Sequence, residues 1–176
     1  ANSRFVSVEI GSGNLDSVKK LFGCIMSIHC LFGVIILIFA ETVGLWFVMT
    51  QLVIPSERMV AAIWVYQSAV LSSIITIISS PYNGLIIAHE KMSAFAVISI
   101  FDAVAKFGIA ILLFYSLIDR LILYAVLHVL IQLIVCLIYA VYCKKKFEES
   151  NYHFIWNKKV SLSVLSFAGW TLTGNI

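Results

Sequence analysis

An acid and a base lie four residues apart in a long apolar stretch and are the strongest candidates for chemistry in this chain. On a helix, Asp102 and Lys106 would share one face, with the acid nearer the N-terminus, and this order favours an ion pair. Ser99 falls on the same stripe. The spacing therefore predicts a short polar patch on an otherwise apolar helix.

An ionised side chain in a membrane-spanning helix costs about 2.5 to 3.5 kcal/mol on insertion scales, so it needs a partner or a water-filled cavity. Two interpretations of the pair of Asp102 and Lys106 follow. The two ions could neutralise each other and pack helices together. Alternatively, they could face a hydrated cavity and contact an anionic substrate or a coupling ion.

A second polar pair with the same spacing is His128 and Gln132. Such groups commonly form hydrogen bonds between membrane helices, but they could also line a pathway. The candidates for a substrate or ion pathway are Asp102, Lys106, Ser99, His128 and Gln132.

The segment SSPYNGLIIAHEKM, residues 79–92, joins two apolar runs and contains a cluster that first suggests a metal site. HEKMS begins like the zinc-protease motif HExxH, but Ser93 stands where the second histidine is needed, so we expect no zinc. Proline lacks a backbone donor, and an Asn-Gly pair favours a turn. The segment therefore predicts a hinge rather than a catalytic site, formed by Pro81, Asn83, Gly84, His89, Glu90 and Lys91.

Other signatures of enzymes and nucleotide-binding proteins are incomplete. The GSG of residues 11–13 lacks the further glycine of a dinucleotide-binding fingerprint and the Gly-Lys-Ser/Thr of a P-loop. No GxSxG nucleophile elbow occurs. We interpret the cysteines, which form no CxxC pair, as small embedded hydrophobic residues: Cys24, Cys30, Cys136 and Cys143. We expect no catalytic residue, metal site, cofactor or nucleic-acid partner.

The composition indicates that a membrane is the solvent of this chain. Hydrophobic residues make up 61% and charged residues 12% of its 176 residues, whereas about a quarter of the residues of a soluble protein are charged. A water-soluble fold of this length could not cover so much apolar surface. Because backbone hydrogen bonds must be satisfied within lipid, we expect an all-α, polytopic bundle of transmembrane helices.

Four apolar runs are long enough to cross a hydrocarbon core of about 30 Å at about 1.5 Å per residue. They are residues 21–40, 59–80, 93–117 and 121–143. Asp119 is placed to cap the fourth helix, and Trp46 and Phe47 suit an amphipathic connection at the membrane surface after the first. Residues 160–176 would start a further helix. We therefore expect residues 1–176 to be an internal part of a longer transmembrane domain.

Lysine and arginine are distributed unequally between the two ends of the predicted spans. Of the 12 such residues, Lys106 lies within a span and only Arg58 and Arg120 lie at one end. The other end has Arg4, Lys19, Lys20, Lys91, Lys144, Lys145, Lys146, Lys158 and Lys159. Because cytoplasmic loops carry the excess of positive charge, this asymmetry places the predicted hinge and the CKKKFEES segment in the cytoplasm.

Seven segments of the chain resemble those of a known family of membrane proteins. They are NSRFVSVEIGSGNLDSVKKLF, AETVGLWFV, LVIPSERMVAAIWVYQ, SPYNGLIIAHEKMSAFAVIS, IDRLILYAVL, CKKKFEES and LSFAGWTLTGNI. In this order they resemble bacterial polysaccharide and O-antigen flippases, which belong to the superfamily of multidrug, oligosaccharidyl-lipid and polysaccharide exporters. The most specific elements are the loop at Pro81–Met92 and the helix start at Phe167–Gly174.

The resemblance implies about twelve to fourteen helices in two bundles around a central cavity, with this chain in the later part of the first bundle. It implies that a lipid-linked oligosaccharide diphosphate crosses the bacterial inner membrane by alternating access, during polysaccharide or lipopolysaccharide biosynthesis. The expected partners are membrane lipid, this substrate and the remaining helices of the same full-length chain.

Two other functions stay open. A cation-coupled multidrug exporter of the same superfamily would use Asp102 as its ion-coupling carboxylate, although the nearby Lys106 favours an anionic substrate. A membrane-embedded enzyme of glycan-lipid metabolism would need loop carboxylates, metal ligands or large loops, and the predicted outward loops are short. We therefore expect a transporter and not an enzyme.

Overall fold

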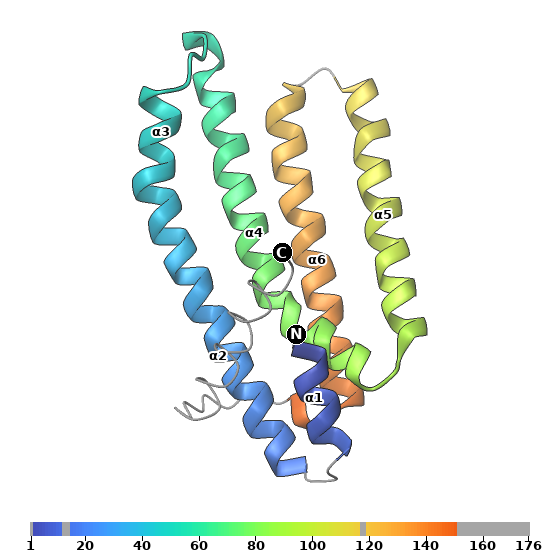
Figure 1. Ribbon diagram of the computed structural model, residues 1–176. Coiled ribbons are helices and arrows are strands. Elements are labelled where there is room, and N and C mark those ends of the chain that lie inside the picture. The colour runs from blue at the N-terminus through green and yellow to red at the C-terminus, as the bar shows by residue number, and fades with distance from the viewer. Residues whose placement is uncertain (1, 12–14, 117–118, 151–176) are drawn as a thin grey trace, which may run out of the picture.

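The described part of the chain is helical apart from short turns. The computed structural model describes residues 2–11, 15–116 and 119–150 (Figure 1). Its α-helices are α1 (Asn2–Gly11), α2 (Leu15–Phe39), α3 (Leu45–Thr50), α4 (Met59–Ala88), α5 (Met92–Tyr115) and α6 (Arg120–Lys146). A π-helical turn, Ala40–Gly44, joins α2 to α3, and single turns of 3-10 helix cover Ser56–Arg58 and Glu148–Ser150. No strand occurs in the described residues, which confirms the predicted all-α fold.

Four helical segments of the described residues are long and apolar enough to cross a membrane. They are Asp16–Thr50, Ser56–Ala88, Met92–Tyr115 and Arg120–Lys146. The chain therefore has the architecture of a multi-pass membrane protein. The third and fourth segments agree closely with the predicted spans, and the predicted cap is confirmed, because the Asp119 carboxylate accepts a hydrogen bond from the Leu121 amide at 3.0 Å. The further helix predicted at residues 160–176 lies outside the described residues.

The first span continues well beyond its predicted end at residue 40. The surface connection predicted after Glu41 was wrong, because the helix runs on to Thr50 and includes Trp46 and Phe47. Glu41 lies within the π-helical turn, and its carboxylate accepts a hydrogen bond from Gln67 Nε2 of α4 at 3.2 Å. Glu41, which was predicted to mark a membrane boundary, is thus hydrogen-bonded to a polar residue of the neighbouring helix.

The π-helical turn between α2 and α3 is held by a contact with α4. The Leu45 amide donates to the Ala40 carbonyl, and the Tyr66 hydroxyl donates to the same oxygen at 2.7 Å. Gly44 lies against this contact, and a Cβ at its position would overlap the Tyr66 hydroxyl. The widened turn therefore depends on a small residue and on a tyrosine from another helix.

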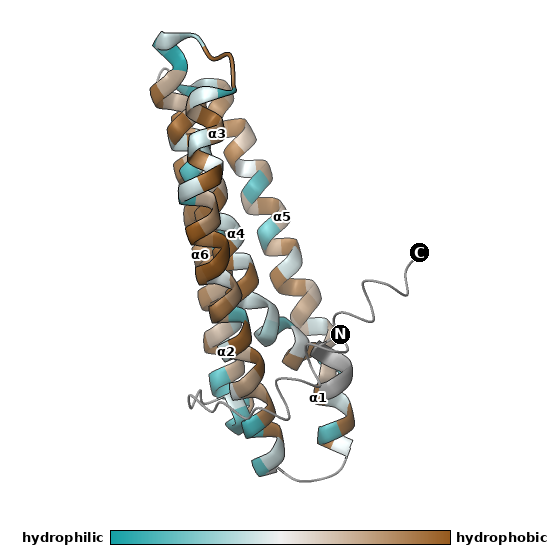
Figure 2. Cartoon of the chain, turned by 60° about the vertical axis from the view of Figure 1, so that its left-hand side comes forward, coloured by the Kyte–Doolittle hydropathy of each residue, from teal (hydrophilic) through white to brown (hydrophobic). Residues whose placement is uncertain are grey.

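The four spans stand side by side in the order α2, α4, α6 and α5 (Figure 1). The contact between α4 and α6 is the most extensive, and α5 packs mainly against α6. Figure 2 shows that hydrophobic residues make up most of the length of the spans. Large apolar side chains such as Phe39, Phe107 and Phe114 are exposed, as expected where lipid or other membrane helices cover the surface.

Buried side chains gather at one end of the bundle, where α1, the connection between α4 and α5, and the end of α6 meet (Figure 1). Phe22 and Ile25 of α2 pack there with Leu85 and Ile86 of α4, and Val6 of α1 joins the same core. All five are almost fully buried. This end of the bundle is therefore held together by its own side chains.

The described basic residues separate between the two ends as predicted. The end with the buried core has the start of α2, the turn after α4 and the end of α6, and so has Lys19, Lys20, Lys91, Lys144, Lys145 and Lys146. The opposite end has Arg58 and Arg120, and Arg58 forms an ion pair with Asp119 at 2.9 Å. Lys158 and Lys159 lie outside the described residues. Which end faces the cytoplasm stays a prediction.

The predicted hinge at Pro81, Asn83 and Gly84 was wrong, because all three residues lie inside α4. Pro81 is fully buried among its neighbours. A proline is tolerated inside a membrane helix where surrounding helices and side chains compensate for the missing backbone donor. Figure 1 shows that α4 bends in its lower part, and Pro81 lies inside this helix and does not end it.

The chain instead reverses at His89, Glu90 and Lys91. The Lys91 amide donates to the Ile86 carbonyl at 3.1 Å and the Glu90 amide to the Ile87 carbonyl at 3.0 Å. This is the Schellman pattern that ends many helices, and its left-handed position is occupied by Glu90, with a φ of 56°. Half of the predicted hinge residues therefore form the turn between α4 and α5.

Candidate functional site

A polar groove lies between α4, α5 and α6, within the membrane-spanning segments. Its volume is about 810 Å³. The polar groove is lined by Ser68, Ser72, Ser73 and Thr76 of α4, Asp102 and Lys106 of α5, and Tyr124, His128 and Gln132 of α6, together with apolar Val65, Ala69, Ile77 and Ala125. The structure thus brings together four of the five residues predicted for a pathway.

The ion pair predicted from the spacing of Asp102 and Lys106 is formed. Lys106 Nζ donates to Asp102 Oδ2 at 2.8 Å, and the side chains are 38% and 28% exposed. The other carboxylate oxygen, Asp102 Oδ1, is buried and has no hydrogen-bond partner. Because an unsatisfied buried oxygen is costly, this atom is a natural contact for a ligand, a water molecule or a cation.

Hydroxyl residues of α4 form a row opposite the ion pair. Thr76 Oγ1 donates to the Ser72 carbonyl at 2.8 Å, and Ser73 Oγ donates to the Ala69 carbonyl at 2.8 Å. By contrast, Ser72 Oγ is buried without a hydrogen-bond partner. This row was not predicted, although Ser68, Ser72 and Thr76 recur every four residues in a charge-free span and would share one helix face.

The α6 side of the polar groove carries an amide and two rings. Gln132 Nε2 donates to Thr76 Oγ1 at 2.9 Å, which links α6 to the hydroxyl row. Tyr124 and His128 stack, with ring centroids 5.6 Å apart and an angle of 24° between the rings. The polar groove therefore combines hydroxyl groups, an amide, aromatic faces and one compensated ion pair.

Ser99 is the candidate that does not line the polar groove. It lies one helical turn before Asp102 on α5, and its side chain forms a hydrogen bond with Tyr139 of α6. Tyr139 is buried. Ser99 therefore helps to join α5 to α6 and does not line the polar groove, and its place in a pathway stays a prediction.

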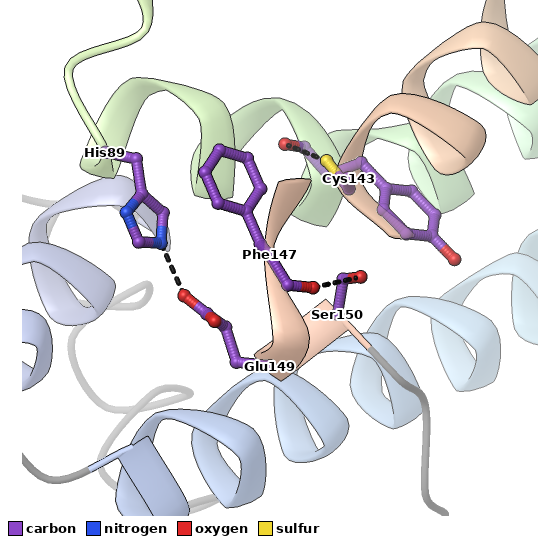
Figure 3. A network of polar contacts seen from close by, with 6 residues as sticks. His89, Cys143, Phe147, Glu149 and Ser150 are labelled. Atoms are coloured by element: carbon purple, nitrogen blue, oxygen red, sulfur yellow. Dashed lines mark hydrogen bonds and ion pairs between the residues drawn. The ribbon is translucent and has the colours of Figure 1, made fainter. Parts of the chain in front are cut away.

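A second polar network lies at the end with the buried core (Figure 3). The ring N–H of His89 Nε2 donates to Glu149 Oε1 at 2.5 Å, and the imidazole stacks on Phe147 with centroids 4.1 Å apart. Nearby, the buried Cys143 thiol donates to the Tyr82 carbonyl at 3.6 Å. These contacts fasten the turn after α4 to the segment after α6, a role that the sequence alone did not suggest.

The described residues contain no group of three or more His, Cys, Asp or Glu side chains that could hold a metal ion. None of the four cysteines forms a disulfide bond, and Cys24 and Cys143 are buried. The polar groove, which brings ionised and polar side chains of three helices together, is the candidate ligand site among the described residues. Comparison of the chain with family models, curated proteins and solved structures finds no match.

Proposed function

We propose that the chain is part of a transporter that moves lipid-linked oligosaccharide or polysaccharide repeat units across the bacterial inner membrane by alternating access. The observation that carries this proposal is the polar groove, which gathers an ion pair, an amide, hydroxyl groups and two rings inside four apolar spans. Ionisable residues within membrane helices commonly mark substrate or ion pathways.

The depth of the groove supports a pathway across the membrane. Asp102 lies near the middle of α5, which covers Met92–Tyr115. At about 1.5 Å per residue, ten residues from the start of the helix correspond to about 15 Å, half of a hydrocarbon core of about 30 Å. Transporters of this general architecture bind substrates near the midplane, where each side of the membrane can be reached in turn.

The exposed surface of the bundle supports a place within a larger assembly of helices. Polar side chains such as Lys106 are not expected to face lipid tails directly, because lipid offers them no hydrogen bonds. Further helices of the same full-length chain would enclose the polar groove and convert it into a cavity. The resemblance of the seven sequence segments to polysaccharide flippases is consistent with such a two-bundle transporter.

The test is complementation with the full-length protein. Lys106→Ala removes the cation of the groove and leaves Asp102 unpaired, so it should lower surface polysaccharide by about tenfold or more while the amount of protein in the membrane stays unchanged. Lys145→Ala, the same change on the exposed end of α6, should have no effect. Normal surface polysaccharide in the Lys106→Ala strain would remove this residue from the mechanism.

A second candidate function is cation-coupled export of drugs, which Asp102 Oδ1 favours as a buried carboxylate oxygen without a partner. In that case Asp102 would bind the coupling ion. Drug susceptibility of a deletion strain distinguishes the two functions. If the protein is an exporter, the deletion strain should be more susceptible to drugs, and the wild-type protein but not the Asp102→Asn variant should restore resistance. If it is a flippase, the deletion strain should instead lose surface polysaccharide.

A further inference from the structure

We infer that the polar groove receives the sugar part of the lipid-linked substrate and not its diphosphate, an inference that rests on the proposed function. The ligand class is a neutral, hydroxyl-rich oligosaccharide. Three properties of the groove support this assignment: its charge balance, its unused hydrogen-bonding groups and its aromatic surface.

The charges in the polar groove cancel. Among the groove residues that the structure describes, Lys106 is the only lysine or arginine, and its Nζ already lies 2.8 Å from Asp102 Oδ2. Diphosphates are typically bound by several cations or by helix N-termini. Here the nearest carboxylate would repel a diphosphate. A neutral ligand can approach the same groove without this repulsion.

The hydrogen-bonding groups match sugar hydroxyls, which both donate and accept. Asp102 Oδ1 and Ser72 Oγ are buried and have no partner. The carboxylate oxygen can accept from one hydroxyl of a ligand, and the serine can donate to or accept from another. Gln132, whose Nε2 bonds to Thr76, keeps its amide oxygen as a further acceptor. A phosphate could use only the donors, because it has no N–H or O–H to offer when ionised.

The aromatic surface matches the other property of a sugar, its apolar C–H face. The stacked rings of Tyr124 and His128 line the groove, and Tyr124 is 45% exposed, so part of its ring is open to a ligand. A sugar ring can lie against such a surface while its hydroxyls reach the polar side chains. The volume of about 810 Å³ also falls in the range of small-molecule binding sites.

The test compares two probes on the full-length protein in lipid nanodiscs. One probe is the lipid-linked oligosaccharide extracted from cells that carry the gene, and the other is a polyprenyl diphosphate of the same chain length without sugar. Tyr124→Ala and Ser72→Ala should each weaken binding of the first probe about tenfold and change binding of the second less than about twofold. Tyr115→Ala and Ser93→Ala, the same changes outside the groove, should leave both affinities unchanged.

Charge variants give an independent readout. The double variant Asp102→Asn with Lys106→Gln keeps the groove neutral but replaces the carboxylate that accepts from the sugar, so it should weaken binding of the lipid-linked oligosaccharide about tenfold and change binding of the sugar-free lipid less than about twofold. For a diphosphate site, the double variant would instead weaken both probes, and Asp102→Asn alone would tighten binding of the sugar-free lipid.

Each outcome has a defined meaning. If the Tyr124 and Ser72 variants lose equal affinity for both probes, or lose affinity for neither, the groove does not bind the sugar. Binding of the lipid-linked oligosaccharide by the wild-type protein would still uphold the proposed function in that case. A wild-type protein that does not bind the lipid-linked oligosaccharide overturns the proposed function itself and, with it, this inference. Selective loss of the sugar-bearing probe supports both.

Discussion

His89, on the turn after α4, and Glu149, beyond the end of α6, form a hydrogen-bonded pair with Nε2 and Oε1 2.5 Å apart. The Glu149 side chain is only 4% exposed, whereas His89 is 23% exposed. A buried carboxylate depends strongly on its partner, because water cannot replace the lost hydrogen bond. The pair therefore fixes the position of the turn relative to the segment that leaves α6.

Glu149→Ala should lower the free energy of unfolding by about 2 kcal/mol, because it removes a buried hydrogen bond to a charged group. Chemical unfolding in detergent micelles, followed by circular dichroism, measures the change. Glu148→Ala is the matched control, since Glu148 is exposed and its removal should change stability by less than about 0.5 kcal/mol. Similar losses for the two variants would contradict a specific role for the pair.

Glu90→Gly should stabilise the protein by up to about 1 kcal/mol. Glu90 occupies the left-handed position of the Schellman turn, with a φ of 56°, where a residue with a Cβ is strained and glycine is not. Glu90→Ala removes the same charge but keeps the Cβ, and it should give no gain. The midpoint of thermal unfolding in one detergent distinguishes the variants, and a gain with alanine would show that charge and not conformation is responsible.

Gly44→Ala should be less favourable than Gly108→Ala by about 1 kcal/mol or more. Both glycines lie in helical segments, but a Cβ at Gly108 meets no atom within 4 Å, whereas one at Gly44 overlaps the Tyr66 hydroxyl. Tyr66 would have to release the Ala40 carbonyl, and the lost hydrogen bond offsets the better helix propensity of alanine.

The variant Tyr66→Phe tests the cause of that difference. In this background Gly44→Ala loses no hydrogen bond and should destabilise the protein less than it does in the wild type. Free energies of unfolding for the two single variants and the double variant give the coupling between these positions. Strictly additive effects would rule out the contact with Tyr66 as the cause.

The spans and the ion pair could be predicted because both depend on residues close together in the sequence. An apolar run marks a membrane helix whatever its neighbours are, and Asp102 and Lys106 share a helix face by their spacing alone. The cap at Asp119 is equally local, since its carboxylate bonds to an amide two residues away. The ion pair and the cap were confirmed, and a long apolar helix covers most of each predicted span, although the first two helices continue beyond the predicted ends.

The features that could not be predicted depend on distant partners. Glu41 lies inside the continued helix and is bonded at 3.2 Å by Gln67 of another helix, and Pro81 lies inside α4, where it is almost fully buried. The polar groove likewise depends on which face each of three helices turns toward the others, and an apolar run does not specify that orientation. Ser72 and Tyr124 became candidates only once those orientations were known.

The direction of the chain in the membrane gives the last prediction. Lysines gather at the end of the bundle that carries Glu148 and are absent from the described residues around Glu57 at the opposite end. The end that carries Glu148 should therefore face the cytoplasm. In intact spheroplasts a membrane-impermeant maleimide should label Glu57→Cys, and it should label Glu148→Cys only after lysis. The wild-type protein is the control, since its four cysteines lie within the spans. The reverse labelling pattern would place the turn at His89 and its partner Glu149 on the outer side of the membrane and would contradict the predicted orientation.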